Sequence, residues 1–249
     1  MVSDRQPYGT FFEHLNELRQ RLIISLTAFF ICVLPTMVYS NRLMAWLVAP
    51  LVREVPSVYF FSPADAFVVK IKISLLAATI LSSPVIFGQL WLFVSPALHG
   101  NEKKMVLPLI AVTTSLFVLG ALFSFYAILP VTLHFLIGMQ SEFMKPLVSV
   151  SEYISFLTSM VFAFGVAFNL PVFILAMVGV GFVNTKMLFQ FQRWAIVLIF
   201  ILAAILTPGP DIASQLLLAI PLVILFEISV AAAWVLEKIK KRKRETVLS

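Results

Sequence analysis

Carboxylates close to the N-terminus are the first residues whose type and spacing suggest chemistry. Glu13 and Glu17 are four residues apart, so they share one face of a helix. Arg19 and Arg21 follow, and Glu17 and Arg21 have the i, i+4 spacing of a helical ion pair worth about 0.2–0.5 kcal/mol. The charged stretch therefore either binds a ligand through its acids or only anchors the apolar helix that begins at Leu22.

Glu102 is a second candidate carboxylate, in the short stretch HGNEKK between two apolar segments. It stands at the predicted start of a helix, where a carboxylate complements the positive end of the helix dipole. Its position therefore has a structural explanation as well as a functional one.

Four polar side chains fall inside or at the start of long apolar segments. They need partners there, because an unpaired polar group in a membrane is costly. Such groups join helices of one chain or contact a helix of a partner subunit, and both alternatives stay open. Glu227, midway along the last segment, also supports an alternative function as a proton- or cation-coupled transporter of small solutes. The four residues are Gln89, Asn169, Gln215 and Glu227.

The sequence offers little support for catalysis. The motifs GxSxG, HExxH, CxxC and the Gly-rich phosphate loop do not occur. The three histidines carry no signature of a shared site, and the single cysteine, Cys32, lies inside an apolar run. We therefore expect no enzyme activity, no metal site and no cofactor.

The composition is typical of a membrane protein. Hydrophobic residues make up 61% of the 249 residues, charged residues make up 12%, and the mean hydropathy is +1.01. A soluble domain has about 45–50% apolar residues. We predict an all-α membrane protein with a single integral membrane domain over residues 1–249. Six segments are expected to cross the bilayer, at 22–40, 67–94, 105–130, 153–181, 194–207 and 216–236.

Prolines are expected to shape these helices. Pro84 and Pro171 fall inside predicted spans, where each removes a backbone donor and can kink the helix. Pro50 lies in MAWLVAPLV, which is too short to span and is expected to form a helix at the membrane interface. The fifth span is short and stops at Pro208, and TPGPDIASQ, which contains Asp211, joins it to the sixth in a tight hairpin.

The distribution of Lys and Arg predicts that both termini are cytoplasmic, because cytoplasmic loops carry an excess of these residues. Much of the net charge of +6 lies in the basic tail at 237–249, which we read as an orientation signal rather than a nucleic-acid site. With the N-terminus inside, the outer loops hold only Arg42, Arg53 and Lys145.

Five stretches, in order along the chain, resemble motifs of the TatC family, the multi-spanning receptor subunit of the twin-arginine protein translocase. Each alone is a weak signal, but five in order between about residues 11 and 236 identify the sequence as a member. The stretches are HLNELRQRL at 14–22, SPADAF at 62–67 with KISLL at 72–76, SSPVIFGQLWLFVSPAL at 82–98 followed by Glu102, FGVAFNLPV at 164–172, and TPGPDIASQLLLAIPLVILFEIS at 207–229.

The resemblance implies a concave, glove-like protein of six helices in the cytoplasmic membrane of a prokaryote. It also implies binding of the Arg-Arg motif of signal peptides on the cytoplasmic face, and no catalytic activity. The implied partners are single-span TatA- and TatB-type subunits and membrane lipids, in an oligomeric complex that moves folded proteins by means of the proton gradient.

The resemblance also assigns site residues. Glu17 and Glu102 match the family's acids associated with signal-peptide recognition, and Leu18 and Arg19 belong to the same N-terminal motif. A guanidinium group forms two parallel hydrogen bonds with a planar carboxylate, and the ammonium group of lysine fits this geometry less well. Two acids from separate segments can therefore recognise a pair of arginines.

Three positions depart from the family pattern. Asn169 stands where the fourth helix usually has an acid, so the resemblance does not carry over a role that needs a charge there, whereas it does carry over hydrogen bonding to a partner helix. Asp65 is shorter than the acid usual before the second helix. Gly88 replaces a common aromatic residue beside Gln89.

Overall fold

The computed structural model describes residues 7–55, 57–95, 106–138, 147–207 and 212–248. For residues 7–12, 180 and 240–248 it describes the backbone alone. Three predicted site residues, Glu102, Pro208 and Asp211, lie outside the described ranges. Within them the long elements are all helices, and six stretches are long and apolar enough to cross a membrane. The predicted all-α membrane fold with six spans is therefore confirmed.

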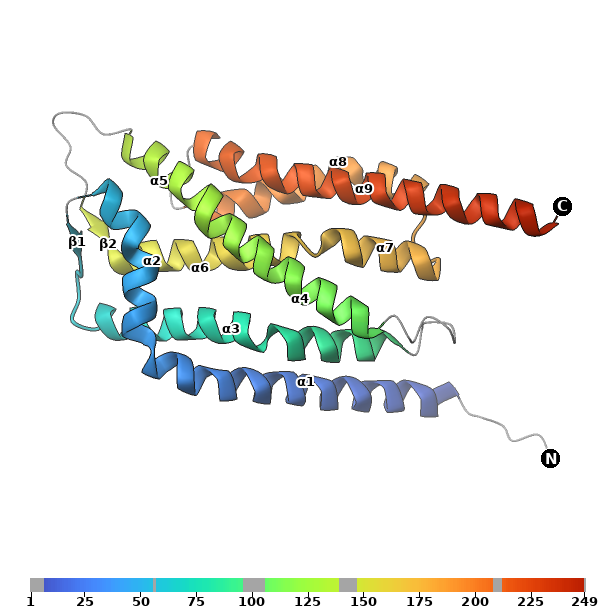
Figure 1. The fold of residues 1–249 in the computed structure, drawn as a ribbon, viewed down its shortest axis with the longest axis horizontal. Helices are drawn as coiled ribbons and strands as arrows, with labels where there is room; N and C mark the ends of the chain where they lie inside the picture. The colour runs from blue at the N-terminus through green and yellow to red at the C-terminus, as the bar shows by residue number, and fades with distance from the viewer. Residues whose placement is uncertain (1–6, 56, 96–105, 139–146, 208–211, 249) are drawn as a thin grey trace.

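The spans follow one another along the chain, and two of them are interrupted (Figure 1). The first two spans are α1 (Pro7–Val38) and α3 (Asp65–Val94). The third combines α4 (Val106–Phe123), the π-helical turn η3 (Ser124–Ile128) and α5 (Leu129–Gly138). The fourth combines α6 (Val150–Ala167) and α7 (Leu170–Val180), and the last two are α8 (Thr185–Leu206) and α9 (Ile212–Leu248).

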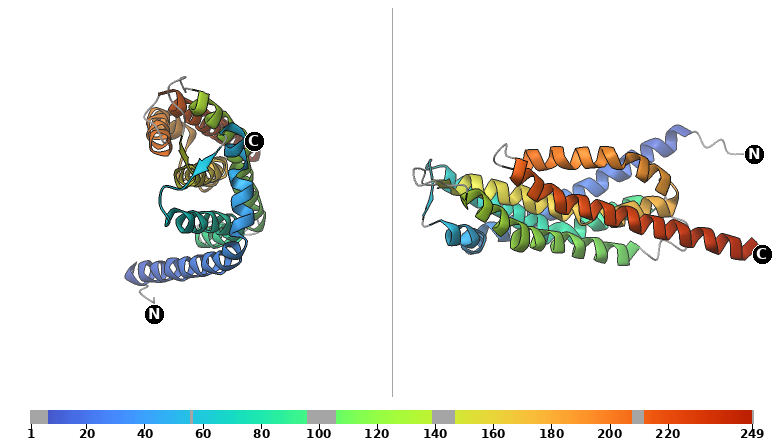
Figure 2. Two further views of the ribbon diagram at one scale, coloured as in Figure 1. Left: turned by 90° about the vertical axis from the view of Figure 1, so that its left-hand side faces the viewer. Right: turned by 90° about the horizontal axis from the view of Figure 1, so that it is seen from above.

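Seen end-on, the helices follow an arc with α1 at one end and α8 at the other (Figure 2). α1 packs mainly against α3, and α8 packs mainly against α9, whereas α3, α4 and α6 pack against one another in the middle. α1 begins and α9 ends at the same end of the bundle (Figure 1). The concave bundle predicted for this sequence is therefore confirmed.

The opposite end of the bundle is closed by a short helix and a pair of strands. α2 (Ser40–Glu54) runs across the ends of the spans (Figure 1) and buries Leu47 and Leu51 against them, with Pro50 inside it. The buried hydroxyl of Tyr153 on α6 donates a hydrogen bond of 2.7 Å to the Leu47 carbonyl. β1 (Val58–Tyr59) pairs in parallel with β2 (Val148–Ser149), with Val58 opposite Val148. The expected helix thus forms, with one face packed on protein, and its place at the membrane interface stays a prediction.

Glycines allow α4 and α6 to approach closely at the centre. A Cβ atom on Gly120 would lie 2.5 Å from the Phe164 carbonyl oxygen, and one on Gly165 would lie 2.6 Å from the Phe117 ring. Small residues at crossing points are typical of membrane helices, where close packing replaces the hydrophobic effect between helices.

The two prolines predicted to lie inside spans have different effects. α3 continues through Pro84, and the Ser83 hydroxyl donates a 2.7 Å hydrogen bond to the Ile80 carbonyl, which Pro84 leaves without its usual N–H donor. The fourth span instead breaks, because α6 ends at Ala167 and α7 begins at Leu170, with Pro171 in its first turn.

The fifth span, α8, begins upstream of the predicted segment, at Thr185 rather than Trp194. The side chain of Asn184 accepts a 2.9 Å hydrogen bond from the Met187 N–H and caps the helix. Glu237 of α9 accepts from both the N–H and the hydroxyl of Thr185. At 22 residues α8 is still the shortest of the six spans.

Candidate functional site

The predicted N-terminal site lies where two antiparallel helices meet. The start of α1 lies beside the end of α3 (Figure 1), so polar residues far apart in the sequence are neighbours. His14, Glu17 and Arg21 follow each other at intervals of three and four residues and share one face of α1. Gln89 and Phe93 are one turn apart on α3. We call these five residues the Glu17 cluster.

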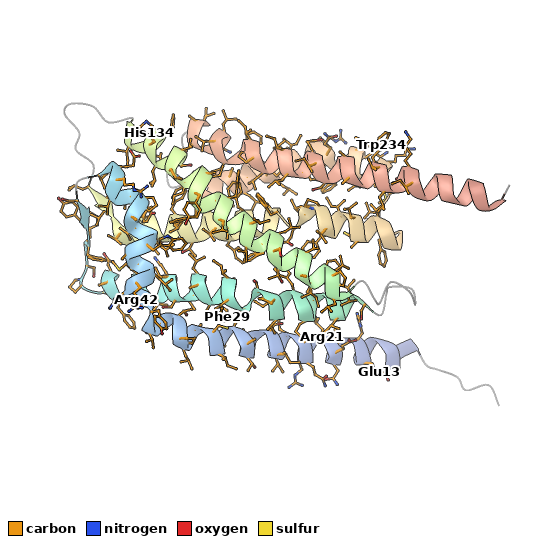
Figure 3. All side chains as sticks on the ribbon, viewed as in Figure 1. Glu13, Arg21, Phe29, Arg42, His134 and Trp234 are labelled. Atoms are coloured by element: carbon orange, nitrogen blue, oxygen red, sulfur yellow. The ribbon has the colours of Figure 1, made fainter. Side chains whose placement is uncertain are left out.

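A guanidinium group holds the cluster together. Nη2 and Nε of Arg21 donate to Oε1 of Glu17 at 2.6 and 3.0 Å, which confirms the predicted i, i+4 pair. Nη1 of the same side chain donates to Oε1 of Gln89 at 3.4 Å. Arg21 therefore links the Glu17 carboxylate on α1 to an amide on α3, and it lies about two turns further along α1 than Glu13, as labelled in Figure 3.

The second carboxylate oxygen makes only a longer contact with the described residues. Oε2 of Glu17 lies 3.8 Å from Nδ1 of His14. The His14 ring stacks on Phe93 of α3, with 4.5 Å between ring centroids and 20° between planes. About a third of the Glu17 side chain, 31%, is exposed, so a ligand can reach the carboxylate from solvent.

The other residues predicted for this site surround the cluster. Leu18 and Arg19 are exposed on α1, as is Glu13 further toward the N-terminus (Figure 3). Glu102 lies outside the described residues, so its distance to Glu17 stays a prediction. The helices that flank it end at Val94 and begin at Val106, at the same end of the bundle as the cluster.

Three of the four polar residues predicted in apolar segments join helices within the chain. Gln215 of α9 donates to the Phe200 carbonyl of α8 at 2.9 Å. Gln192 of α8 donates to Oε1 of Glu227 on α9 at 2.5 Å. Gln89 accepts from Arg21, as described above. These contacts correspond to the structural alternative, contacts between helices of the same chain.

Asn169 is different, because half of its amide has no partner. The side chain is fully buried at the break between α6 and α7, and its Nδ2 donates to the Gly165 carbonyl of the preceding turn at 2.9 Å. Its Oδ1 accepts no hydrogen bond from any described residue. A buried amide oxygen without a donor is costly, and because this atom is shielded within the chain, a donor from another molecule reaches it only if the break between α6 and α7 opens.

The sequence located Glu17 but missed part of its surroundings. His14, Arg21 and Phe93 are not among the site residues that the sequence predicts. The spacing of His14, Glu17 and Arg21 was a usable signal, since it places all three on one helix face. The contacts to Gln89 and Phe93 depend on the register between α1 and α3, which no local pattern encodes.

The cluster offers hydrogen-bond acceptors for a cation rather than catalytic groups. Within the described ranges no group of three His, Cys, Asp or Glu side chains could hold a metal ion. What the cluster contains is a partly exposed carboxylate already bonded to a guanidinium, beside an aromatic ring and an amide.

Comparisons with known proteins identify the family. The family model described as "Sec-independent protein translocase protein (TatC)" matches residues 13–221. The TatC proteins of Carboxydothermus hydrogenoformans and Aquifex aeolicus are 37% and 38% identical, over 90% and 94% of this chain and 92% and 97% of their own length. A crystal structure of the twin-arginine translocase receptor TatC, 38% identical, superposes with a TM-score of 0.84 over 90% of this chain and 99% of that one. The chain therefore belongs to the TatC family, multi-pass membrane components of the Sec-independent protein translocase.

Proposed function

We propose that this protein is the receptor subunit that binds twin-arginine signal peptides at the cytoplasmic face of the inner membrane. The main support is the Glu17 carboxylate, which already accepts two hydrogen bonds from a guanidinium group and is partly exposed. The same chemistry suits a guanidinium of the peptide. Glu102 is the proposed acceptor for the second arginine.

We place the Glu17 cluster and both termini on the cytoplasmic side. The basic stretch forms the last part of α9, which ends at the same end of the bundle as the start of α1 (Figure 1). The excess of Lys and Arg at that end supports this orientation by the positive-inside rule. A signal peptide arriving from the cytoplasm then meets Glu17 before it meets the membrane-spanning part.

We further propose partners within the membrane, namely single-span subunits of the TatA and TatB type in an oligomeric complex driven by the proton-motive force. Oδ1 of Asn169, which has no donor among the described residues, supports a polar contact with such a helix that forms when the break between α6 and α7 opens. The first and fifth spans support it as well, because only 6% of the residues in their most apolar stretch are buried within this chain.

The alternative, a small-solute transporter that uses Glu227, has less support. Glu227 is engaged by Gln192 in a contact between α8 and α9. The family to which the chain belongs is a protein translocase component. We therefore assign Glu227 a structural role.

Export of a folded reporter tests the proposal. In bacterial cells whose only TatC-type subunit is this chain, a reporter with an Arg-Arg signal should be exported and the same reporter with a Lys-Lys signal should be retained. Equal export of both, or no export while the protein is present in the membrane, would contradict the receptor function.

A further inference from the structure

We propose that Arg21 is an internal competitor for the peptide site: in the free protein its guanidinium occupies Glu17, and an arginine of the signal peptide must displace it. The inference rests on the proposed function, since it takes Glu17 as the peptide's acceptor. It concerns how that acceptor is regulated.

Arg21 occupies one of the two oxygens of the Glu17 carboxylate. Both Arg21 donors, Nη2 at 2.6 Å and Nε at 3.0 Å, bond to the same oxygen, Oε1 of Glu17. A guanidinium binds a carboxylate most strongly when two parallel N–H bonds reach both oxygens. While Arg21 stays in place, an incoming arginine finds only Oε2, which faces His14. A bidentate bond to the peptide therefore requires Arg21 to leave Oε1.

The displaced arginine has an acceptor of its own. Oε1 of Gln89 lies 3.4 Å from Nη1 of Arg21 in the free protein, and it belongs to α3 rather than α1. The Arg21 side chain is 23% exposed, so its other donors can turn to water. The exchange thus replaces one charged pair by another without leaving a buried guanidinium unpaired.

The strength of the competition follows from the exposure of the pair. Partly exposed ion pairs on a helix are weak, so Arg21 can be displaced, yet it should lower the apparent affinity for the peptide by a factor of about two to five. Competition lowers the fraction of receptor in which Glu17 is free. The apparent affinity of every ligand of Glu17 is reduced by this same fraction. Arg21→Gln should therefore tighten Arg-Arg and Lys-Lys peptides by the same factor and leave their ratio unchanged.

Other roles for Arg21 predict a different result. If Arg21 oriented Glu17 for the peptide, its removal would weaken binding. If it contacted the peptide directly, the ratio between the Arg-Arg and Lys-Lys peptides would change. The sign of the affinity change and the constancy of the ratio thus separate competition from positioning.

The experiment measures dissociation constants of a fluorescent Arg-Arg signal peptide and its Lys-Lys counterpart for the purified full-length protein in lipid nanodiscs. The variants are Arg21→Gln, Glu17→Gln and the double variant. Arg193→Gln is the matched control, because it removes the same charge from an exposed position on α8. Arg21→Lys, which keeps the charge but loses the guanidinium fork, should give a smaller gain and serves if Arg21→Gln does not fold.

Arg21→Gln should bind both peptides about two- to fivefold more tightly than the wild type. Arg193→Gln should bind them as the wild type does, and the double variant should bind them no more tightly than Glu17→Gln. Unchanged or weaker binding to the Arg21 variants, with binding lost in Glu17→Gln, would overturn this inference and leave the proposed function standing. Equal binding to wild type and Glu17→Gln, or no binding to any variant, would overturn both.

Discussion

Asn169 is one of four described residues with a buried side-chain polar atom that has no hydrogen-bond partner. Its amide donates to the backbone of its own helix, and its oxygen accepts nothing from the described residues. Replacing it with leucine removes an unpaired buried acceptor, so the free energy of unfolding should change by less than about 1 kcal/mol. If a partner helix supplies the missing donor, co-purification of the single-span subunits from membranes should fall.

Asn184→Leu is the control for that experiment. Asn184 caps α8, so its loss should lower the melting temperature in detergent, at a cost of about 0.5–2 kcal/mol, without affecting co-purification. A large loss of stability in Asn169→Leu, with partner binding unchanged, would show that Asn169 acts only within this chain.

At the same scale, the sequence predicts contacts within one helix but not those between helices. The Glu17–Arg21 pair followed from a spacing of four residues. The contact between Arg21 and Gln89 spans 68 positions, and it depends on how far α1 is shifted along α3. The same limit applies to His14 and Phe93, whose stacking no pattern near either residue indicates.

At the scale of elements, the closest contact between α4 and α6 depends on Gly120. Gly120→Ala places a methyl group 2.5 Å from the Phe164 carbonyl oxygen, so the helices must separate, and we expect a loss of about 1–3 kcal/mol in unfolding free energy. Gly179→Ala is the matched control, because a Cβ there meets nothing within 4 Å. Melting temperatures in detergent should fall for Gly120→Ala alone, and equal melting of both variants would contradict the packing described here.

Element boundaries show where hydropathy misleads. The apolar run placed the start of the fifth helix at Trp194, whereas the helix begins at Thr185. The local signal was present, since Asn184 is a favourable cap. The second signal, Glu237 on α9, is tertiary and could not be read from the segment itself.

At the scale of the whole molecule, the orientation in the membrane is a proposal that labelling can test. In a Cys32→Ser background, a cysteine at exposed Ser57 lies at the end closed by α2, and one at exposed Glu13 lies at the opposite end. With both termini cytoplasmic, a membrane-impermeant maleimide should label Ser57→Cys in intact spheroplasts. Glu13→Cys should react only after the membrane is opened, and the reverse pattern would contradict the orientation.

The number of spans was predictable from the six apolar segments. The concave shape was predictable from the five stretches that resemble the family's motifs. The composition determines that helices cross a bilayer. It does not determine which helices stand at the ends of the arc. The position of α1 and α8 at the ends of the arc emerges only from packing, and these two spans leave most apolar surface for lipid or partner subunits.

The most direct test of the account is the affinity of an Arg-Arg signal peptide for Glu17→Gln, with Glu13→Gln, one turn earlier on the same helix, as the matched control. A hydrogen bond to a charged group is worth about 1.5–3 kcal/mol, so Glu17→Gln should weaken binding by about tenfold or more while Glu13→Gln binds as wild type. Wild-type affinity in Glu17→Gln would contradict the proposed site.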